Sequence, residues 1–151
     1  MHMHHSSLTI DGLTCVCNAL RKASRSVTRF YDEKMENTGI SLAQFAVLRN
    51  IGRREPLPLM DLAHILVMDR TTLYRALKPL AREGWIALED GHGRAKTVRL
   101  TSKGHEAVAN STDAWHAAQR SLVERFGLDR WATTETALQD LVTISQEATT
   151  Q

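Results

Sequence analysis

The hydrophobic pattern changes its period at Gly84, and this change most constrains the fold. Before Gly84, in the segment DRTTLYRALKPLAREG, apolar residues recur every three or four positions, which predicts a helix. After it, the segments WIALED and TVRLT alternate apolar and polar residues on either side of the glycine-rich segment GHGRAK. Such a pattern is typical of a β-hairpin. The sequence therefore predicts a helix that leads directly into a hairpin.

Glycines and small polar residues mark where the other helices begin and end. Apolar residues at steps of three and four predict a first helix from residue 12 to just before Gly39. Ser41 and Gln44 have the spacing of a capping box that opens a second helix. Pro58 suits the start of a short third helix.

The helix before the hairpin and the two helices after it have similar signals. Asp69 is a suitable N-cap for the helix that precedes Gly84. Thr101 is expected to cap a long helix that ends at Phe126, and a last helix covers about residues 130–146.

This order of elements predicts a mainly α protein with a small β-hairpin wing, a winged helix-turn-helix. Residues 1–10 are expected to form a disordered tail, and 11–151 a single domain. Within the domain, the winged-helix lobe covers 41–101. The helices at 12–38 and 102–148 carry apolar stripes longer than such a lobe can cover, so we expect them to form a dimer.

The helix after Asp69 has a basic face opposite its apolar stripe. Arginine on such a face can pair with guanine in the major groove, and threonine and tyrosine can contact other base edges, whereas Lys78 is better placed for phosphate. The hairpin turn adds two cations, of which an arginine can enter a narrow minor groove. The residues expected to contact double-stranded DNA are Arg70, Thr71, Thr72, Tyr74, Arg75, Lys78, Arg94 and Lys96. A merely solvated basic surface is the alternative.

Charge along the chain agrees with a polyanionic partner for the middle segment. Residues 53–103 hold ten Lys or Arg and six Asp or Glu, a net charge of +4, whereas residues 104–151 hold three and seven, a net charge of −4. An acidic or neutral outer face would have favoured a winged helix that binds protein partners, and the sequence has the reverse.

Several other classes of function are not expected. No apolar segment approaches the roughly 20 residues that span a bilayer, and the N-terminus lacks the apolar core of a secretion signal, so we expect a cytoplasmic protein. The chain has no catalytic motif, and the segment CVC has no Cys or His partner at metal-ligand spacing nearby, so neither enzyme activity nor a metal or cofactor is expected.

Four segments and the end of the hairpin resemble the MarR family of bacterial transcription regulators over about residues 12–146. They are GISLAQFAVL, DLAHIL, TTLYRAL, LAREGWI and the closing VRLTSKG. The resemblance implies a homodimer that places two recognition helices in successive major grooves of a pseudo-palindromic operator, expected to act as a repressor. The wing departs from the family pattern, because His92-Gly93-Arg94 stands where Asp-Arg-Arg is usual.

The segment CVC suggests a thiol sensor as one alternative signal. Residues two apart on a helix lie about 200° apart around its axis, so Cys15 and Cys17 are not expected to form a disulfide without unwinding it. Cys17 resembles the reactive cysteine of the hydroperoxide-sensing branch of the family, and Tyr31 one tyrosine that holds its thiolate. Leu42 stands where the second such tyrosine falls. The other reading of Cys17 is a small core residue.

The commoner signal in the family is a small aromatic or phenolic carboxylate that binds between the dimer helices and the DNA-binding lobe. Residues that could supply charge and stacking for such an effector are Arg21, Arg25, Trp115 and His116. They could equally be dimer contacts.

Overall fold

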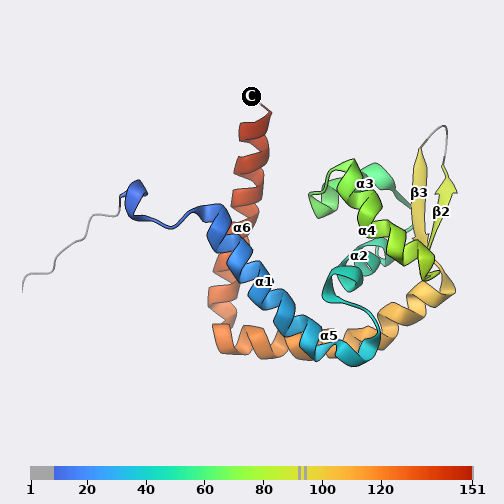
Figure 1. Ribbon diagram of the computed structural model, residues 1–151, viewed down its shortest axis with the longest axis horizontal. Helices are drawn as coiled ribbons and strands as arrows, with labels where there is room; N and C mark the ends of the chain where they lie inside the picture. Colours follow the sequence, from blue (N-terminus) through green and yellow to red (C-terminus); the bar gives the residue numbers. More distant parts are fainter. Residues whose placement is uncertain (1–8, 92, 94, 151) are drawn as a thin grey trace, which may run out of the picture.

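The computed structural model describes residues 9–91, 93 and 95–150 of the 151-residue chain, and it confirms the mainly helical fold with a hairpin (Figure 1). The helices are α1 (Val16–Lys34), α2 (Leu42–Gly52), α3 (Leu59–Leu66), α4 (Arg70–Arg82), α5 (Ser102–Phe126) and α6 (Leu128–Thr149). Two short 3₁₀ helices are η1 (Ile10–Gly12) and η2 (Glu36–Thr38), and the strands are β1 (Leu57–Pro58), β2 (Ile86–Asp90) and β3 (Lys96–Leu100).

The predicted caps of α2 and α5 are present. The Ser41 side chain accepts a hydrogen bond from the backbone N–H of Gln44, and the Gln44 side chain accepts one from the backbone N–H of Ser41. The Thr101 hydroxyl accepts from Gly104 N at 3.0 Å. These bonds satisfy N–H groups that a helix leaves unpaired in its first turn.

The structure corrects three expectations. The sheet has three strands in the order β1-β3-β2, because Leu57 and Pro58 pair with Val98 and Thr97 before α3 begins. A strand of two residues is too short to produce a periodic pattern. The first helix begins at Val16, and a 3₁₀ turn occupies Ile10–Gly12, so the expected tail covers at most residues 1–9, of which 1–8 lie outside the described residues. The last helix is longer than predicted.

The hydrophobic core lies in the lobe formed by α2, α3, α4 and the sheet. Its fully buried side chains include Phe45, Leu48, Ile51, Leu62, Leu73, Leu77, Leu80 and Val98. Trp115 and Val108, from the first two thirds of α5, pack against this cluster. The core therefore attaches the near half of α5 to the lobe.

The turn between α3 and α4 contains a strained residue. Val67 adopts the left-handed conformation with φ +53° and ψ +46°, and it is exposed. This region favours glycine, and a β-branched side chain there is a steric outlier. The backbone N–H of Val67 donates to the carbonyl of His64, which closes α3.

The start of α5 is packed directly on the segment that follows α4. A Cβ atom on Gly104 would lie 2.0 Å from the carbonyl oxygen of Trp85, so only glycine fits there. The Thr101 hydroxyl donates to Gly84 O at 2.6 Å, and Lys103 Nζ donates to Glu83 O at 2.8 Å. These contacts thus hold the end of α4 against the first turn of α5.

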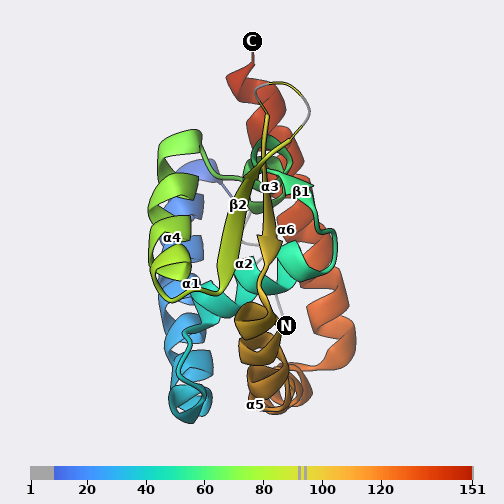
Figure 2. The same ribbon diagram turned by 90° about the vertical axis from the view of Figure 1, so that its right-hand side faces the viewer.

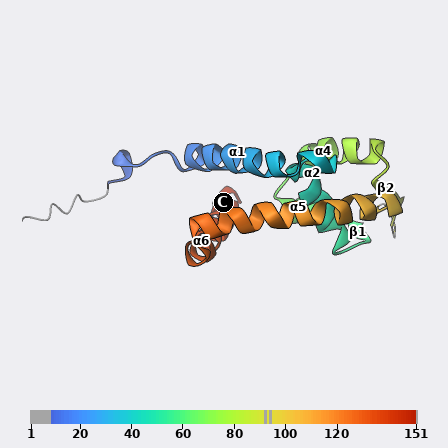
Figure 3. The same cartoon turned by 90° about the horizontal axis from the view of Figure 1, so that it is seen from below.

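The helices outside the lobe bury little of their apolar surface within the chain. Helix α1 packs on α5, and α5 on α6 (Figures 1 and 3). Within the described residues, α6 has no buried side chain, and Tyr31 is the only buried side chain of α1. Exposed apolar residues on these helices and beside them are Leu13, Val16, Leu20, Val27, Leu128, Val142 and Ile144. A free surface of this kind suits a protein partner.

Candidate nucleic-acid interface

Helix α4 separates its apolar and basic residues onto opposite faces. Leu73, Leu77 and Leu80 are buried in the lobe. The predicted DNA-contacting residues of this helix, Arg70, Thr71, Thr72, Tyr74, Arg75 and Lys78, are all exposed. This face carries three cations and no carboxylate, and its residues project from the first three turns of the helix.

The N-terminus of α4 is fixed by the predicted cap. The Asp69 carboxylate accepts a hydrogen bond of 2.7 Å from the backbone N–H of Thr72. This bond is the main reason that the pKa of Asp69 is lowered, and the positive charge of Arg75 acts in the same direction. The cap therefore holds the first turn, which carries Arg70 and Thr71, in helical geometry.

Helix α4 and the base of the wing share a hollow of about 200 Å³. It is lined from α4 by Arg70 and Tyr74, and from β3 by Lys96. Arg70 Cζ lies 6.0 Å from the centre of the Tyr74 ring. The walls from the start of α3 are apolar, among them Pro58 and Met60. The structure thus brings together three of the predicted DNA-contacting residues, from two separate elements.

Strands β2 and β3 of the hairpin run beside α3 and α4 (Figures 1 and 2). Its strands pair over five positions, from Ile86 with Leu100 to Asp90 with Lys96. At its outer surface Arg99 Nε donates to Glu89 Oε1 at 2.5 Å. The predicted wing arginine, Arg94, lies outside the described residues, as does His92.

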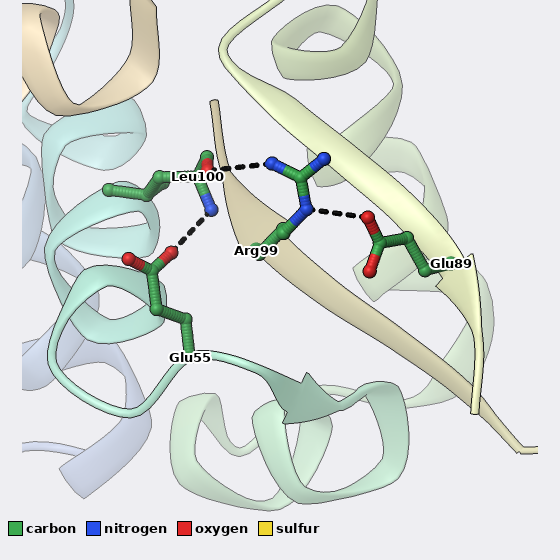
Figure 4. Close-up of polar contacts among 4 residues, drawn as sticks. All are labelled: Glu55, Glu89, Arg99 and Leu100. Carbon is green, nitrogen blue, oxygen red and sulfur yellow. Dashed lines mark hydrogen bonds and ion pairs between the residues drawn. The ribbon is translucent and has the colours of Figure 1, made fainter. Parts of the chain in front are cut away.

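A polar network at the base of the wing was not predicted from the sequence. The Glu55 carboxylate accepts a hydrogen bond from Leu100 N, and Arg99 links Leu100 to Glu89 across the hairpin (Figure 4). The second oxygen of Glu55 lies 2.6 Å from His105 Nε2 on α5. A single glutamate before a proline produces no periodic signal, so sequence reasoning had nothing by which to find it.

The predicted thiol-sensing pair is not in contact within one chain. Cys17 and Tyr31 lie on the same helix fourteen positions apart, which is about 21 Å along its axis. Tyr31 is buried and its hydroxyl donates to Gln119 Oε1, and burial raises the pKa of Tyr31. Cys15 is the N-cap of α1, outside the helix, so the rotation argument against a disulfide does not apply to it. Both thiols are free and exposed.

The four residues proposed for an effector pocket lie on two helices. Trp115 stacks on Phe45 with ring centres 5.7 Å apart, and Arg49 Cζ lies 4.1 Å from the centre of the Trp115 ring. His116 packs edge-on against Trp115 at 4.9 Å.

Arg21 and Arg25 are exposed on α1, where Arg25 lines a shallow surface hollow with Arg29. Phe45 and Arg49 of α2 already contact the Trp115 ring. Among the described residues, no three His, Cys, Asp or Glu side chains are grouped as a metal site would require, and no helix is long and apolar enough to cross a membrane.

Comparison with known proteins matches this lobe to one family. The model of the MarR family matches residues 40–91. An uncharacterised HTH-type transcriptional regulator of Staphylococcus aureus is 31% identical over 74 residues, which are 48% of this chain and 51% of the relative. The chain thus spans about half the length of this relative.

Solved structures match over most of the chain. The Mycobacterium tuberculosis transcriptional regulator MosR in complex with DNA is similar with a TM-score of 0.82 and 26% identity, over 89% of this chain and 98% of that one. The S. aureus MepR–DNA complex is similar with a TM-score of 0.72 and 20% identity, over 87% and 98%. The first and last helices therefore belong to the same fold as the lobe.

Replacement of Asp69 tests the cap of α4 through its pH dependence. Because the folded-state pKa of Asp69 is lowered, its stabilising contribution is present above the unfolded-state pKa and is lost as the pH falls. We expect Asp69→Ala to lower the urea midpoint at pH 7, and the gap to wild type to shrink between about pH 5 and pH 2. Asp69→Asn keeps a capping oxygen without the charge, so its gap should be smaller, and it should shrink over the same pH range because neither variant carries the titrating carboxyl group. A gap for Asp69→Ala that stays constant down to pH 2 would contradict this role.

Proposed function

We infer that the chain belongs to the MarR family of winged helix-turn-helix regulators, and we propose that it is a sequence-specific, double-stranded DNA-binding transcription regulator. The observation that carries the proposal is the exposed face of α4, which has cations and hydroxyl groups, no carboxylate, and a shared hollow with Lys96 of the wing. We further propose that it acts in the cytoplasm, as a repressor, and as a binding protein with no catalytic role.

The chemistry of this face suits the major groove of B-DNA. Arg70 and Arg75 each have a planar pair of donors that matches the two acceptors of guanine. The hydroxyl groups of Thr71 and Thr72 can donate to acceptors or accept from donors on base edges. Lys78 lies a turn further along and suits a phosphate, which fixes position without reading sequence. Lys96 at the base of the wing is placed for a second backbone contact.

We propose that the active form is a homodimer built from α1, α5 and α6. The support is the apolar surface that these helices leave exposed, such as Ile144 at 60% and Val16 at 58% of full exposure. Burial of one such side chain is worth about 1.5–3 kcal/mol, so covering several of them can hold two chains together. Two recognition helices would then lie about one turn of B-DNA apart, or about 34 Å.

Arg75→Ala tests whether α4 reads DNA. Loss of a bidentate contact with guanine should cost about 1–3 kcal/mol, so operator affinity should fall by about 5- to 150-fold while the unfolding curve is unchanged. Binding is measured by fluorescence anisotropy on genomic fragments that the wild-type protein selects. Arg120→Ala removes the same charge from an exposed position on α5 and serves as the matched control.

Unchanged operator affinity in Arg75→Ala would remove this residue from the reading set. The salt dependence of wild-type binding separates DNA binding from a protein-interaction module. Contacts to several phosphates require affinity to fall steeply as salt is added, since each contact releases counterions.

Ile144→Glu tests the proposed dimer. A carboxylate on this exposed apolar position would be buried without a partner in the dimer, whereas in a monomer it would remain in solvent. We expect wild type to sediment with the mass of two chains, and Ile144→Glu to shift toward one. Glu147→Gln, on the exposed surface of the same helix, should keep the wild-type mass. A wild-type protein that sediments as a monomer would contradict the proposal.

We propose that a small ligand modulates DNA affinity, with a thiol switch at Cys17 as the second candidate. The stack of Trp115, His116 and Arg49 supplies aromatic and cationic groups at the junction of α2 and α5, which supports the first. Exposure of Cys17 supports the second.

Peroxide distinguishes the two signals. A switch at Cys17 predicts that peroxide releases DNA from wild type and not from Cys17→Ser. If peroxide releases DNA from neither protein, and an aromatic carboxylate such as salicylate releases it from both, the signal is a ligand.

A further inference from the structure

The Glu55 carboxylate lies where three elements meet and uses both of its oxygens. It belongs to the segment between α2 and β1. Its Oε2 atom accepts a hydrogen bond of 2.7 Å from the backbone N–H of Leu100, at the end of β3 (Figure 4). Its Oε1 atom lies 2.6 Å from Nε2 of His105, in the first turns of α5. The side chain is three quarters buried.

The sheet explains why a side chain is needed at this position. Leu57 is paired with Val98 in antiparallel register, so an extension of β1 by two residues would bring Glu55 opposite Leu100. The pairing instead stops at Leu57. The backbone N–H of Leu100 would then lack a partner in a residue that is 4% exposed, which is costly. The Glu55 carboxylate takes the place that a longer strand would occupy.

The first turn of α5 has a second set of contacts, with the segment that follows α4. Lys103 and Thr101 donate to the carbonyls of Glu83 and Gly84, and Gly104 lies against Trp85. These contacts attach α5 to the end of α4. The contacts of Glu55 attach α5 to the wing and to the end of α2. The lobe is therefore held to α5 on two sides, and Glu55 supplies the side that includes the wing.

We propose that Glu55 is a positioning residue that sets the angle of the winged-helix lobe on α5, and with it the operator half-site spacing that the dimer accepts. The proposal rests on the proposed function. Helix α5 has 25 residues, so it is about 37 Å long. A tilt of about 5° at its start displaces its far end by about 3 Å, close to the rise of one base pair, about 3.4 Å. If the contacts of Glu55 are loosened slightly, the dimer can therefore accept an operator whose half-site spacing differs by one base pair.

Half-site spacing is the discriminating measurement, because Glu55 does not belong to the DNA-contacting face. Operators selected by the wild-type protein are remade with the two half-sites moved one base pair closer or further apart. We expect the affinity of wild type to be about tenfold higher for the selected spacing than for the altered ones. For Glu55→Ala this ratio should be less than about twofold, and the salt dependence of binding should be the same. Glu55→Gln keeps an acceptor for Leu100 N and should restore most of the preference.

Arg54→Ala is the matched control. Arg54 is the neighbouring residue, it is exposed, and it donates to Asn50 within the same helix end rather than to the wing or α5. It should keep the wild-type spacing preference. If Glu55→Ala keeps that preference too, or loses the same factor of affinity at every spacing, Glu55 has only a general structural role and the proposal is overturned.

Two measurements on the free protein separate failure of this inference from failure of the proposed function. Hydrogen exchange at the Leu100 amide should be about tenfold faster in Glu55→Ala and close to wild type in Glu55→Gln. Spin labels at Ala81→Cys, with Cys15 and Cys17 replaced by serine, should give a broader distance distribution between subunits in Glu55→Ala. If the wild-type protein has no operator affinity, the proposed function is overturned. If exchange at Leu100 and the distances between subunits are unchanged in Glu55→Ala, the positioning role of Glu55 is overturned.

Discussion

The packing of the first turn of α5 on the backbone of Trp85 is the contact on which the architecture depends. Gly104 allows the helix to approach the Trp85 carbonyl more closely than any other residue would. The backbone N–H of Thr101 donates to the same carbonyl at 3.0 Å. Because Trp85 follows α4 and begins the hairpin, this contact places the end of α4 and the start of the wing against the first turn of α5.

Local features of the fold could be predicted because each depends on a few neighbouring residues. The capping box at Ser41, the cap at Asp69 and the change of period at Gly84 are all present in the structure. Each acts over three or four positions, which is the range over which a side chain contacts its own backbone. The basic face of α4 was predictable for the same reason, since helical periodicity alone assigns its residues to one side.

Contacts between distant segments could not be predicted. Glu55 reaches Leu100 and His105, about 45 to 50 positions away, and Tyr31 reaches Gln119 across 88 positions. The packing of Trp115 on Phe45 is likewise a contact between two helices. Such pairs depend on how elements pack, and one sequence carries no record of that. The start of α1 was predicted too early because its apolar stripe continues into Leu13, which precedes the helix.

Val67 is a position in the turn between α3 and α4 where a substitution could increase the stability of the protein. A β-branched residue held in the left-handed region costs about 1–2 kcal/mol relative to a residue that adopts it freely. Its side chain is exposed, so the core would lose nothing if glycine replaced it. An engineer who needs a hardier variant for a biosensor could thus begin at a position that leaves the basic face of α4 unaltered.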